Sequence, residues 1–451
     1  MDTPADDSIG VADRPTGGPA ADTTATPSAP SATAAAAPPS VPPKKTGGLN
    51  LKAFDALNVR NFRFYALSGL FQMAAMNMQM LANGWFAYHL TGSSAVLGLT
   101  LLATAIPQVL LSFVGGVVSD RVPRKLLMQG VFTVNGLLAL WIGVWAQFGL
   151  ITWHDLVIRA FFLGCTFAFL MPSRQGIIGE LVGRERIMSA VSVNQALMNI
   201  MQFVGPAIAG FIIAWVSIQG AYYVIAGLFA CAALAMVPVR YTPRKVVSKA
   251  GFSGFLGNIT DGLKYVRTNR NVMLILLISL LTVTFSMPYN QLLPVFAKDV
   301  LDVGPDRLGL LSSLSGVGAL IGSTTVAFMA SKKRGMLFMR SGLLLGVGLV
   351  AFCISSSYAV SAAIVLVVGA GAAIRMTLSM TLLQTYTEDA YMGRVLSINM
   401  MQMGLTSLAG FGVAVFAEAV GVQWAVGMTS VLLVLTVVGF LVFSPRMRKL
   451  A

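Results

Sequence analysis

The sequence has little charge, cysteine or histidine. Only 11% of its 451 residues are charged, whereas a typical soluble domain has about 25%. Its three cysteines all lie in apolar stretches and have neither zinc-site nor redox-motif spacing. The sequence also has no G-x-x-x-x-G-K loop that would bind a nucleoside triphosphate. We therefore expect no enzyme activity, no bound metal and no cofactor.

Long apolar runs account for most of the chain instead. Hydrophobic residues make up 56% of it, and stretches of about 20 apolar residues, long enough to cross a bilayer as helices, recur along the sequence. The alternating segments of about 10 residues that are typical of membrane β-barrels do not occur. We predict an all-α membrane protein with twelve transmembrane helices, at residues 64–90, 94–119, 126–148, 154–173, 189–216, 219–239, 272–297, 307–330, 335–356, 359–384, 395–418 and 421–443.

The longest polar connection divides these spans into two groups of six. Short stretches recur in both groups, "VLGL" (96–99) with "RLGL" (307–310), and "VSVN" (191–194) with "LSIN" (396–399). Parallel six-span repeats are one known transporter architecture, and an N-terminal stretch rich in Ala, Pro, Thr and Ser favours disorder. We expect a disordered cytoplasmic tail at 1–48, two pseudo-symmetric six-helix bundles at 49–240 and 271–444, a cytoplasmic linker at 241–270 and a cytoplasmic tail at 445–451.

Lysine and arginine determine the expected orientation. If the N-terminus is cytoplasmic, the cation-rich connections lie on the cytoplasmic side of the membrane. The connections on the outer side then contain only two cations, Lys298 and Arg307. The net charge of +14 is spread over these connections, so we expect no nucleic-acid partner. We expect a monomer in the cytoplasmic (inner) membrane with both termini inside, whose partners are the lipid bilayer and a small-molecule substrate.

One polar stretch, "GVVSDRVPRK" (116–125), follows the second span. Its residues Gly116, Asp120, Arg121, Arg124 and Lys125 resemble the G-x-x-x-D-R-x-x-R-K loop signature of the major facilitator superfamily. The resemblance implies that Asp120 caps a helix of the other half, where a carboxylate is favoured, and that the cations tie neighbouring cytoplasmic helix ends into a gate. A simple orientation anchor would explain the cations but not the acid.

Further stretches narrow the resemblance. "GPAIAGFI" (205–212), with Gly205, Pro206 and Gly210, resembles the kinked Gly-Pro span of proton-driven exporters in that superfamily; an ordinary packed kink is the alternative. "WFAYHLTGSSAVLGL" (85–99) and "MPSRQGIIGELVGRERIMSAVSVNQALMN" (171–199) resemble the transmembrane secretion effectors, an enterobactin-exporter-like branch related to macrolide-efflux pumps.

This resemblance implies a secondary active transporter that exports amphiphilic small molecules of the drug, antibiotic or siderophore class, by alternating access and proton antiport. Two alternatives remain open. One is an importer or symporter on the same fold, and the other is a membrane assembly or lipid-handling protein that does not transport.

Amides and methionines recur on the faces of several spans. Helical spacing places those of the first span on one face. Amides form hydrogen bonds without carrying charge and methionine adapts its shape, so we predict a substrate cavity; hydrogen bonds between helices are the alternative. The candidates are Gln72, Met76, Gln79, Asn83, Asn194, Met198, Gln202, Tyr289, Asn290, Asn399, Gln402 and Met403.

A few charges lie within the spans. Arg375 is a further candidate for the cavity or a gate, because a charge inside a membrane costs about 3 kcal/mol or more. Arg159 is expected to snorkel to the outer surface, and Arg174 to serve the cytoplasmic gate. The sequence has no acid near the middle of any span. Protons, the implied coupling ion, are therefore expected to bind at a helix end, at Glu180 or Asp120.

Overall fold

The computed structural model describes residues 51–240, 252–328 and 333–444. The chain divides into two units, residues 1–50 and residues 51–451, and every described residue belongs to the second. Both predicted tails and part of the predicted linker therefore lie outside the described residues. So do the side chains of Asp120 and Met403.

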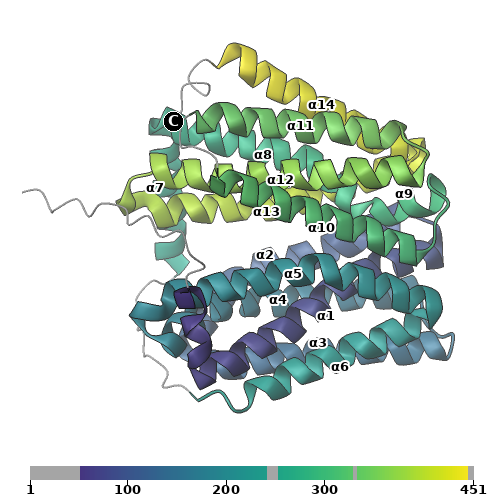
Figure 1. Cartoon of the computed structure of the whole chain (residues 1–451), viewed down its shortest axis with the longest axis horizontal. Coiled ribbons are helices and arrows are strands. Elements are labelled where there is room, and N and C mark those ends of the chain that lie inside the picture. The colour runs from purple at the N-terminus through teal and green to yellow at the C-terminus, as the bar shows by residue number, and fades with distance from the viewer. Residues whose placement is uncertain (1–50, 241–251, 329–332, 445–451) are drawn as a thin grey trace, which may run out of the picture. The chain divides into compact units, whose positions relative to one another are not determined.

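Two sets of helices make up most of the described chain (Figure 1). The first set consists of α1 (Arg60–Thr91), α2 (Ser94–Arg121), α3 (Arg124–Gln147), α4 (Trp153–Val182), α5 (Ile187–Trp215) and α6 (Ile218–Met236). The second set consists of α8 (Arg270–Gln291), α9 (Leu293–Asp299), α10 (Pro305–Phe328), α11 (Arg334–Ile354), α12 (Tyr358–Tyr386), α13 (Asp389–Val420) and α14 (Val422–Phe443).

Three further helices flank the two sets. The short helix η1 (Leu51–Asn58) packs against α1 and α5, and η2 (Arg184–Arg186) joins α4 to α5. Helix α7 (Phe252–Thr268) packs against α13 and α8. No strand occurs within the described ranges.

The prediction of an all-α membrane protein is confirmed. Eleven of the described helices are long and apolar enough to cross a membrane. Helix α1 is long enough, but Gln72, Asn77, Gln79 and Asn83 make it less apolar than the others. It packs along α5 and α6 and corresponds to the first predicted span.

Two of the predicted segments, a span and the linker, differ in kind from the structure. The predicted span 272–297 is divided at Leu292 into α8 and α9. Pro294 lies in the first turn of α9 and has no N–H to continue the hydrogen bonding of α8. The predicted linker contains helix α7, which is held on α13 by the stacked rings of Tyr265 and Tyr391, with centroids 4.2 Å apart.

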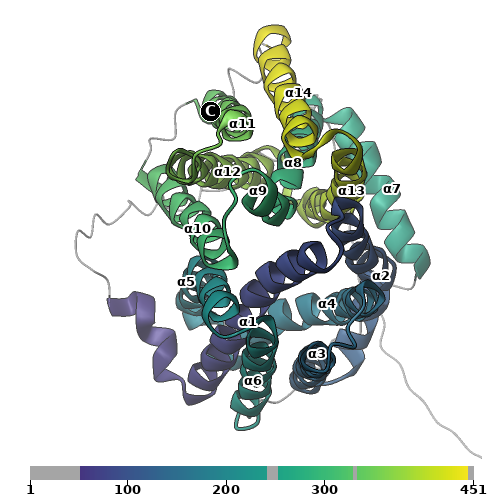
Figure 2. The same ribbon diagram turned by 90° about the vertical axis from the view of Figure 1, so that its right-hand side faces the viewer.

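The two sets pack against each other at the end that carries the α1–α2 and α9–α10 connections. We call this the α9 end and the opposite end the α7 end (Figure 1). Two helix pairs make most of the contact between the sets, α5 with α10 and α2 with α13, and α1 also packs against α9. Figure 2 views the molecule from the α9 end and shows both pairs. Toward the α7 end the ribbons of the two sets separate (Figure 1).

The α5–α10 contact joins backbone to backbone. A Cβ added at Gly309 would lie 2.6 Å from the carbonyl oxygen of Pro206 and 3.1 Å from Cα of Gly210. A Cβ added at Gly210 would overlap the carbonyl oxygen of Pro305. Small residues allow such close approach, on which helix association inside a membrane depends. The glycines therefore determine how closely the two sets meet.

Gly210→Ala is expected to force α5 and α10 apart and to lower the free energy of unfolding by about 1–3 kcal/mol, because the added methyl group overpacks a backbone contact. Gly227→Ala in α6 is the matched control, since its Cβ would meet no atom within 4 Å. Thermal unfolding of the purified proteins measures both. Equal losses in the two variants would contradict the close contact.

Candidate transport site and gates

Two cations of the predicted gate motif tie helix ends together within the first set. Arg124 Nη1 lies 2.8 Å from Oε1 of Glu180 in α4, and Lys125 Nζ donates to the carbonyl oxygen of Val237, just beyond α6, at 2.7 Å. The Arg124 guanidinium also lies against Gly176, where any Cβ would overlap it. These contacts fix the ends of α3, α4 and α6 relative to one another.

The other residues of the motif give less information. Arg121 is exposed, and space is open where a Cβ on Gly116 would lie. The side chain of Asp120 lies outside the described residues, so its contact with a helix of the other half remains a prediction.

The Gly-Pro stretch lies where α5 meets both α1 and α10. A Cβ at Gly205 would lie 2.7 Å from Cβ of Asn77 in α1. On the α10 side, the hydroxyl of Ser313 donates to the carbonyl oxygen of Phe203. Helix α5 is continuous through Pro206. The stretch is thus a packing joint between the two sets of helices.

Two carboxylates of the second set accept hydrogen bonds from the first set at the α9 end. Oε2 of Glu418 in α13 accepts from the hydroxyl of Ser94 at 2.9 Å and from the backbone N–H of Ala95 at 3.1 Å, at the start of α2. Asp299, the last residue of α9, accepts from the hydroxyl of Tyr88 in α1. We call Tyr88, Ser94, Asp299 and Glu418 the α9-end latch.

This latch was not predicted from the sequence. A signal was present, because Glu418 ends an apolar span and Ser93 and Ser94 begin another. Nothing in the sequence indicated that those two ends meet.

The structure brings five of the predicted residues together in the first set. Arg174 in α4 donates from Nη1 to Oε1 of Gln72 in α1 at 3.2 Å, and from Nη2 to Oδ1 of Asn194 in α5 at 3.4 Å. Gln72 and Asn194 each also place an amide nitrogen beside the sulfur of a methionine one turn away, Met76 and Met198 respectively. Arg174 and Gln72 are buried, and the other three are partly buried.

Arg159 corrects an expectation from the sequence. It was predicted to snorkel to the outer surface, but it is only 2% exposed. Its Nη1 donates to Oδ1 of Asn83, which also accepts from the hydroxyl of Tyr222 at 2.7 Å. The guanidinium lies over the Tyr222 ring, 5.1 Å from its centroid. Asn83, predicted to line a cavity, is thus engaged in a bond between helices.

Arg375 of α12 is buried against α8. Its Nη1 lies 3.2 Å from the hydroxyl oxygen of Thr282, while its Nε has no hydrogen-bond partner. One turn further along, Ser379 donates to the hydroxyl oxygen of Ser279 at 3.1 Å. Gln402 of α13 donates to the carbonyl oxygen of Leu276 in α8 at 3.2 Å.

The remaining candidates are spread over the helices. Tyr289 is buried edge-on against Phe352, with ring centroids 5.5 Å apart. By exposure, Gln79 is buried, Asn399 is partly buried, and Gln202 and Asn290 are exposed. The structure thus gathers candidates around Arg174 rather than along one continuous face.

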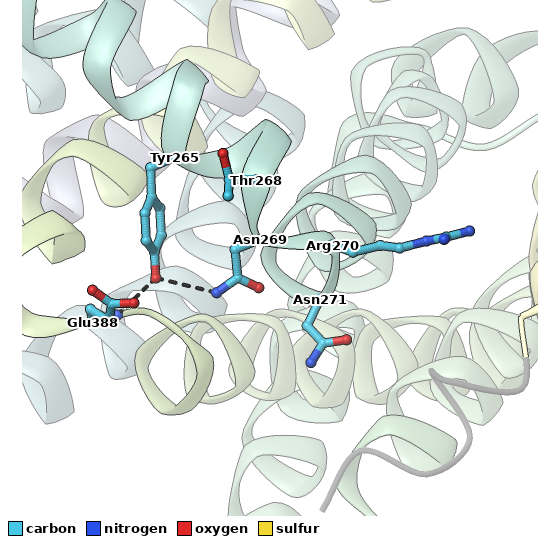
Figure 3. Close-up of a pocket in the computed structure, with 6 residues that line it drawn as sticks. All are labelled: Tyr265, Thr268, Asn269, Arg270, Asn271 and Glu388. Atoms are coloured by element: carbon cyan, nitrogen blue, oxygen red, sulfur yellow. Dashed lines mark hydrogen bonds between the residues drawn. The ribbon is translucent and has the colours of Figure 1, made fainter.

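A surface pocket of about 340 Å³ at the α7 end contains no predicted site residue (Figure 3). It is lined by Tyr265, Thr268, Asn269, Arg270, Asn271 and Glu388. The Tyr265 hydroxyl oxygen accepts from the backbone N–H of Glu388 at 3.1 Å and from Nδ2 of Asn269 at 3.3 Å. These bonds hold the junction of α7 and α8 against the start of α13.

The all-helical fold with its many membrane-spanning helices is that of a membrane transporter of the major facilitator superfamily. Residues 52–450 match the transmembrane secretion effector family, and the chain belongs to it.

Relatives carry the names of transporters and efflux proteins. The staphyloferrin A transporter of Staphylococcus aureus is 26% identical, over 75% of this chain and 85% of that protein. Macrolide efflux protein A of Streptococcus pyogenes is 23% identical, over 74% of this chain and 83% of that protein.

Solved structures share the fold. The nucleoside transporter NupG superposes with a TM-score of 0.68 at 14% identity, covering 85% of this chain and 99% of that one. A D-xylose–proton symporter superposes with a TM-score of 0.63 at 16% identity, covering 86% and 98%.

A double-mutant cycle tests the latch. Ser94→Ala and Glu418→Gln are expected to be non-additive by about 0.5–1 kcal/mol in the free energy of unfolding, the scale of one hydrogen bond at a partly exposed site. Thermal unfolding of the two single variants and the double variant measures the coupling. Asp302→Asn, at an exposed acid of the α9–α10 connection, replaces Glu418→Gln in the control cycle and should be additive with Ser94→Ala. Additivity in both cycles would contradict the latch.

Proposed function

We propose that this transporter is a secondary active exporter of amphiphilic small molecules of the drug, antibiotic or siderophore class, working by alternating access. In this proposal residues 49–240 and 271–444 are two halves that rock against each other. The linker at 241–270 and the tails at 1–48 and 445–451 lie in the cytoplasm. The name of one relative, macrolide efflux protein A, supports the direction of transport.

The observation that carries the proposal is the placement of contacts between the halves. The backbone contact of α5 with α10 and the latch all lie toward the α9 end. The positive-inside rule places the α7 end, where Arg121, Arg124 and Lys125 lie, in the cytoplasm. In that orientation the α9-end contacts would close the outer side, and solute would enter from the cytoplasmic side. Export requires the α9-end contacts to open and the gate motif to close in their place.

Proton antiport is the proposed energy source. None of the side chains described as buried is a carboxylate, so a proton site is proposed at a helix end rather than in the centre. Glu180 is suited to this role because it is paired with Arg124 of the gate motif, at side-chain exposures of 13% and 17%. Protonation of Glu180 would remove that ion pair and loosen the end of α4. Asp120 is the second candidate.

In proteoliposomes, an imposed pH gradient is expected to drive solute movement, and an uncoupler should abolish it. Glu180→Gln should reduce the response to the gradient at least about tenfold while leaving gradient-free counterflow in place, because a neutral amide cannot be protonated in this range. Glu185→Gln, an exposed acid a few residues further along, is the matched control.

Several outcomes would contradict this mechanism. Full accumulation without any gradient would show a facilitator, and a requirement for sodium with indifference to pH would rule out proton coupling. Movement of solute and protons in the same direction would show a symporter.

A further inference from the structure

The charged side chains buried inside the described part of the chain are all arginines. Arg159, Arg174 and Arg375 are 2%, 6% and 7% exposed, and the buried residues of this part of the chain include no Asp, Glu or Lys. In the two helix sets, the acids lie near helix ends, as Glu180 and Glu418 do. The described interior of the two sets is therefore net positive.

Burying these positive charges without a compensating negative charge costs free energy. A buried ion needs good electrostatic partners to offset the loss of hydration. The chain provides one where Arg124 meets Glu180 at 2.8 Å, on a partly exposed helix end. It provides no carboxylate partner, among the described side chains, for the buried arginines.

The three buried arginines are not equally well satisfied. Arg159 has the Asn83 oxygen and the face of Tyr222, which together give it a structural role. Arg375 has one neutral hydroxyl at 3.2 Å and an Nε without a partner. Arg174 has two neutral amide oxygens, one at the long end of the usual hydrogen-bond range at 3.2 Å and one beyond it at 3.4 Å, and the neutral hydroxyl of Tyr65 lies nearby.

The two poorly satisfied arginines occupy corresponding places in the two sets. Arg174 extends from α4 to α1, and Arg375 extends from α12 to α8. Helices α4 and α12 are the fourth spans of their sets, and α1 and α8 are the first. The residues they contact, Gln72 and Thr282, are each twelve positions past the first residue of their helix. One guanidinium from each set thus contacts a residue equally far along the first helix of that set.

We infer that the transported solute is an anion of the carboxylate class and that Arg174 and Arg375 bind it. This inference rests on the proposed function and names its substrate class. A guanidinium binds a carboxylate through two parallel hydrogen bonds, which neither a hydroxyl nor a single amide oxygen can form. The anion supplies the charge that the interior lacks, and the same positive interior repels cationic amphiphiles.

Two xanthene dyes of opposite charge test the inference, carboxyfluorescein as the anion and rhodamine 123 as the cation. In counterflow with proteoliposomes, the wild-type protein should move carboxyfluorescein at least about tenfold faster than rhodamine 123, because a hydrogen bond to a charged group contributes at least about the 1.4 kcal/mol that a tenfold ratio represents. Arg174→Gln and Arg375→Gln should each raise the KM for carboxyfluorescein about tenfold or more. Arg375→Lys should restore part of the loss, because it keeps the charge.

Arg340→Gln is the matched control, since Arg340 is an exposed arginine in helix α11. It should leave the dye preference unchanged. The amount of folded protein in the membrane is measured for every variant, and the preference of the wild-type protein tests the inference even if a variant does not fold.

Equal or faster transport of rhodamine 123, transport of neither dye, or an unchanged preference in both Gln variants would overturn the inference. Failure of the proposed function gives a different result. If the protein exports a neutral amphiphile but not the anion, the proposed function stands and the inference fails. If no gradient or counterflow moves any solute, the proposed function itself fails.

Discussion

The close contact between the backbones of α5 and α10 is the constraint on which the rest of the structure depends. Gly210 and Gly309 meet with no room for a side chain, and the Gly-Pro stretch places α5 against α1 on its other side. A contact between two backbones has no long side chains that could adjust to movement, so it is either made or broken. It holds the two sets together at the α9 end, and the latch adds hydrogen bonds at the same end.

Scarcity of charge explains where the polar contacts lie. In lipid, charged groups are tolerated at helix ends or where protein surrounds them. The acids of the two sets accordingly lie near helix ends, where Glu418 joins the sets and Glu180 pairs with Arg124 of the gate motif. Among the described residues the buried charges are arginines alone. The proposals above assign the completion of that site to an anionic solute and the closing of the gates to the helix-end acids.

The fold could be predicted from the sequence, but the pairing of residues between helices could not. Long apolar runs predict the helices, and the longest polar connection predicts the break at the centre of the chain. The end of α8 shortly before Pro294 was not predicted. Helical spacing predicts that Gln72 and Met76 share a face, and their side chains are in contact. The expectation for Arg159 was wrong because its partners, Asn83 and Tyr222, lie on other helices. The latch was missed for the same reason.

Distances across the two ends of the molecule test the central claim, that the α9 end and the α7 end open alternately. Spin labels at the exposed positions Thr152 and Ser356 span the sets at the α9 end, and labels at Val122 and Lys333 span them at the α7 end. When transported solute and acidic pH are applied to the protein in nanodiscs, pulsed electron–electron double resonance should show the distance at the α9 end lengthening as the distance at the α7 end shortens. If both distances stay fixed, or both change in the same direction, the alternating-access account is contradicted.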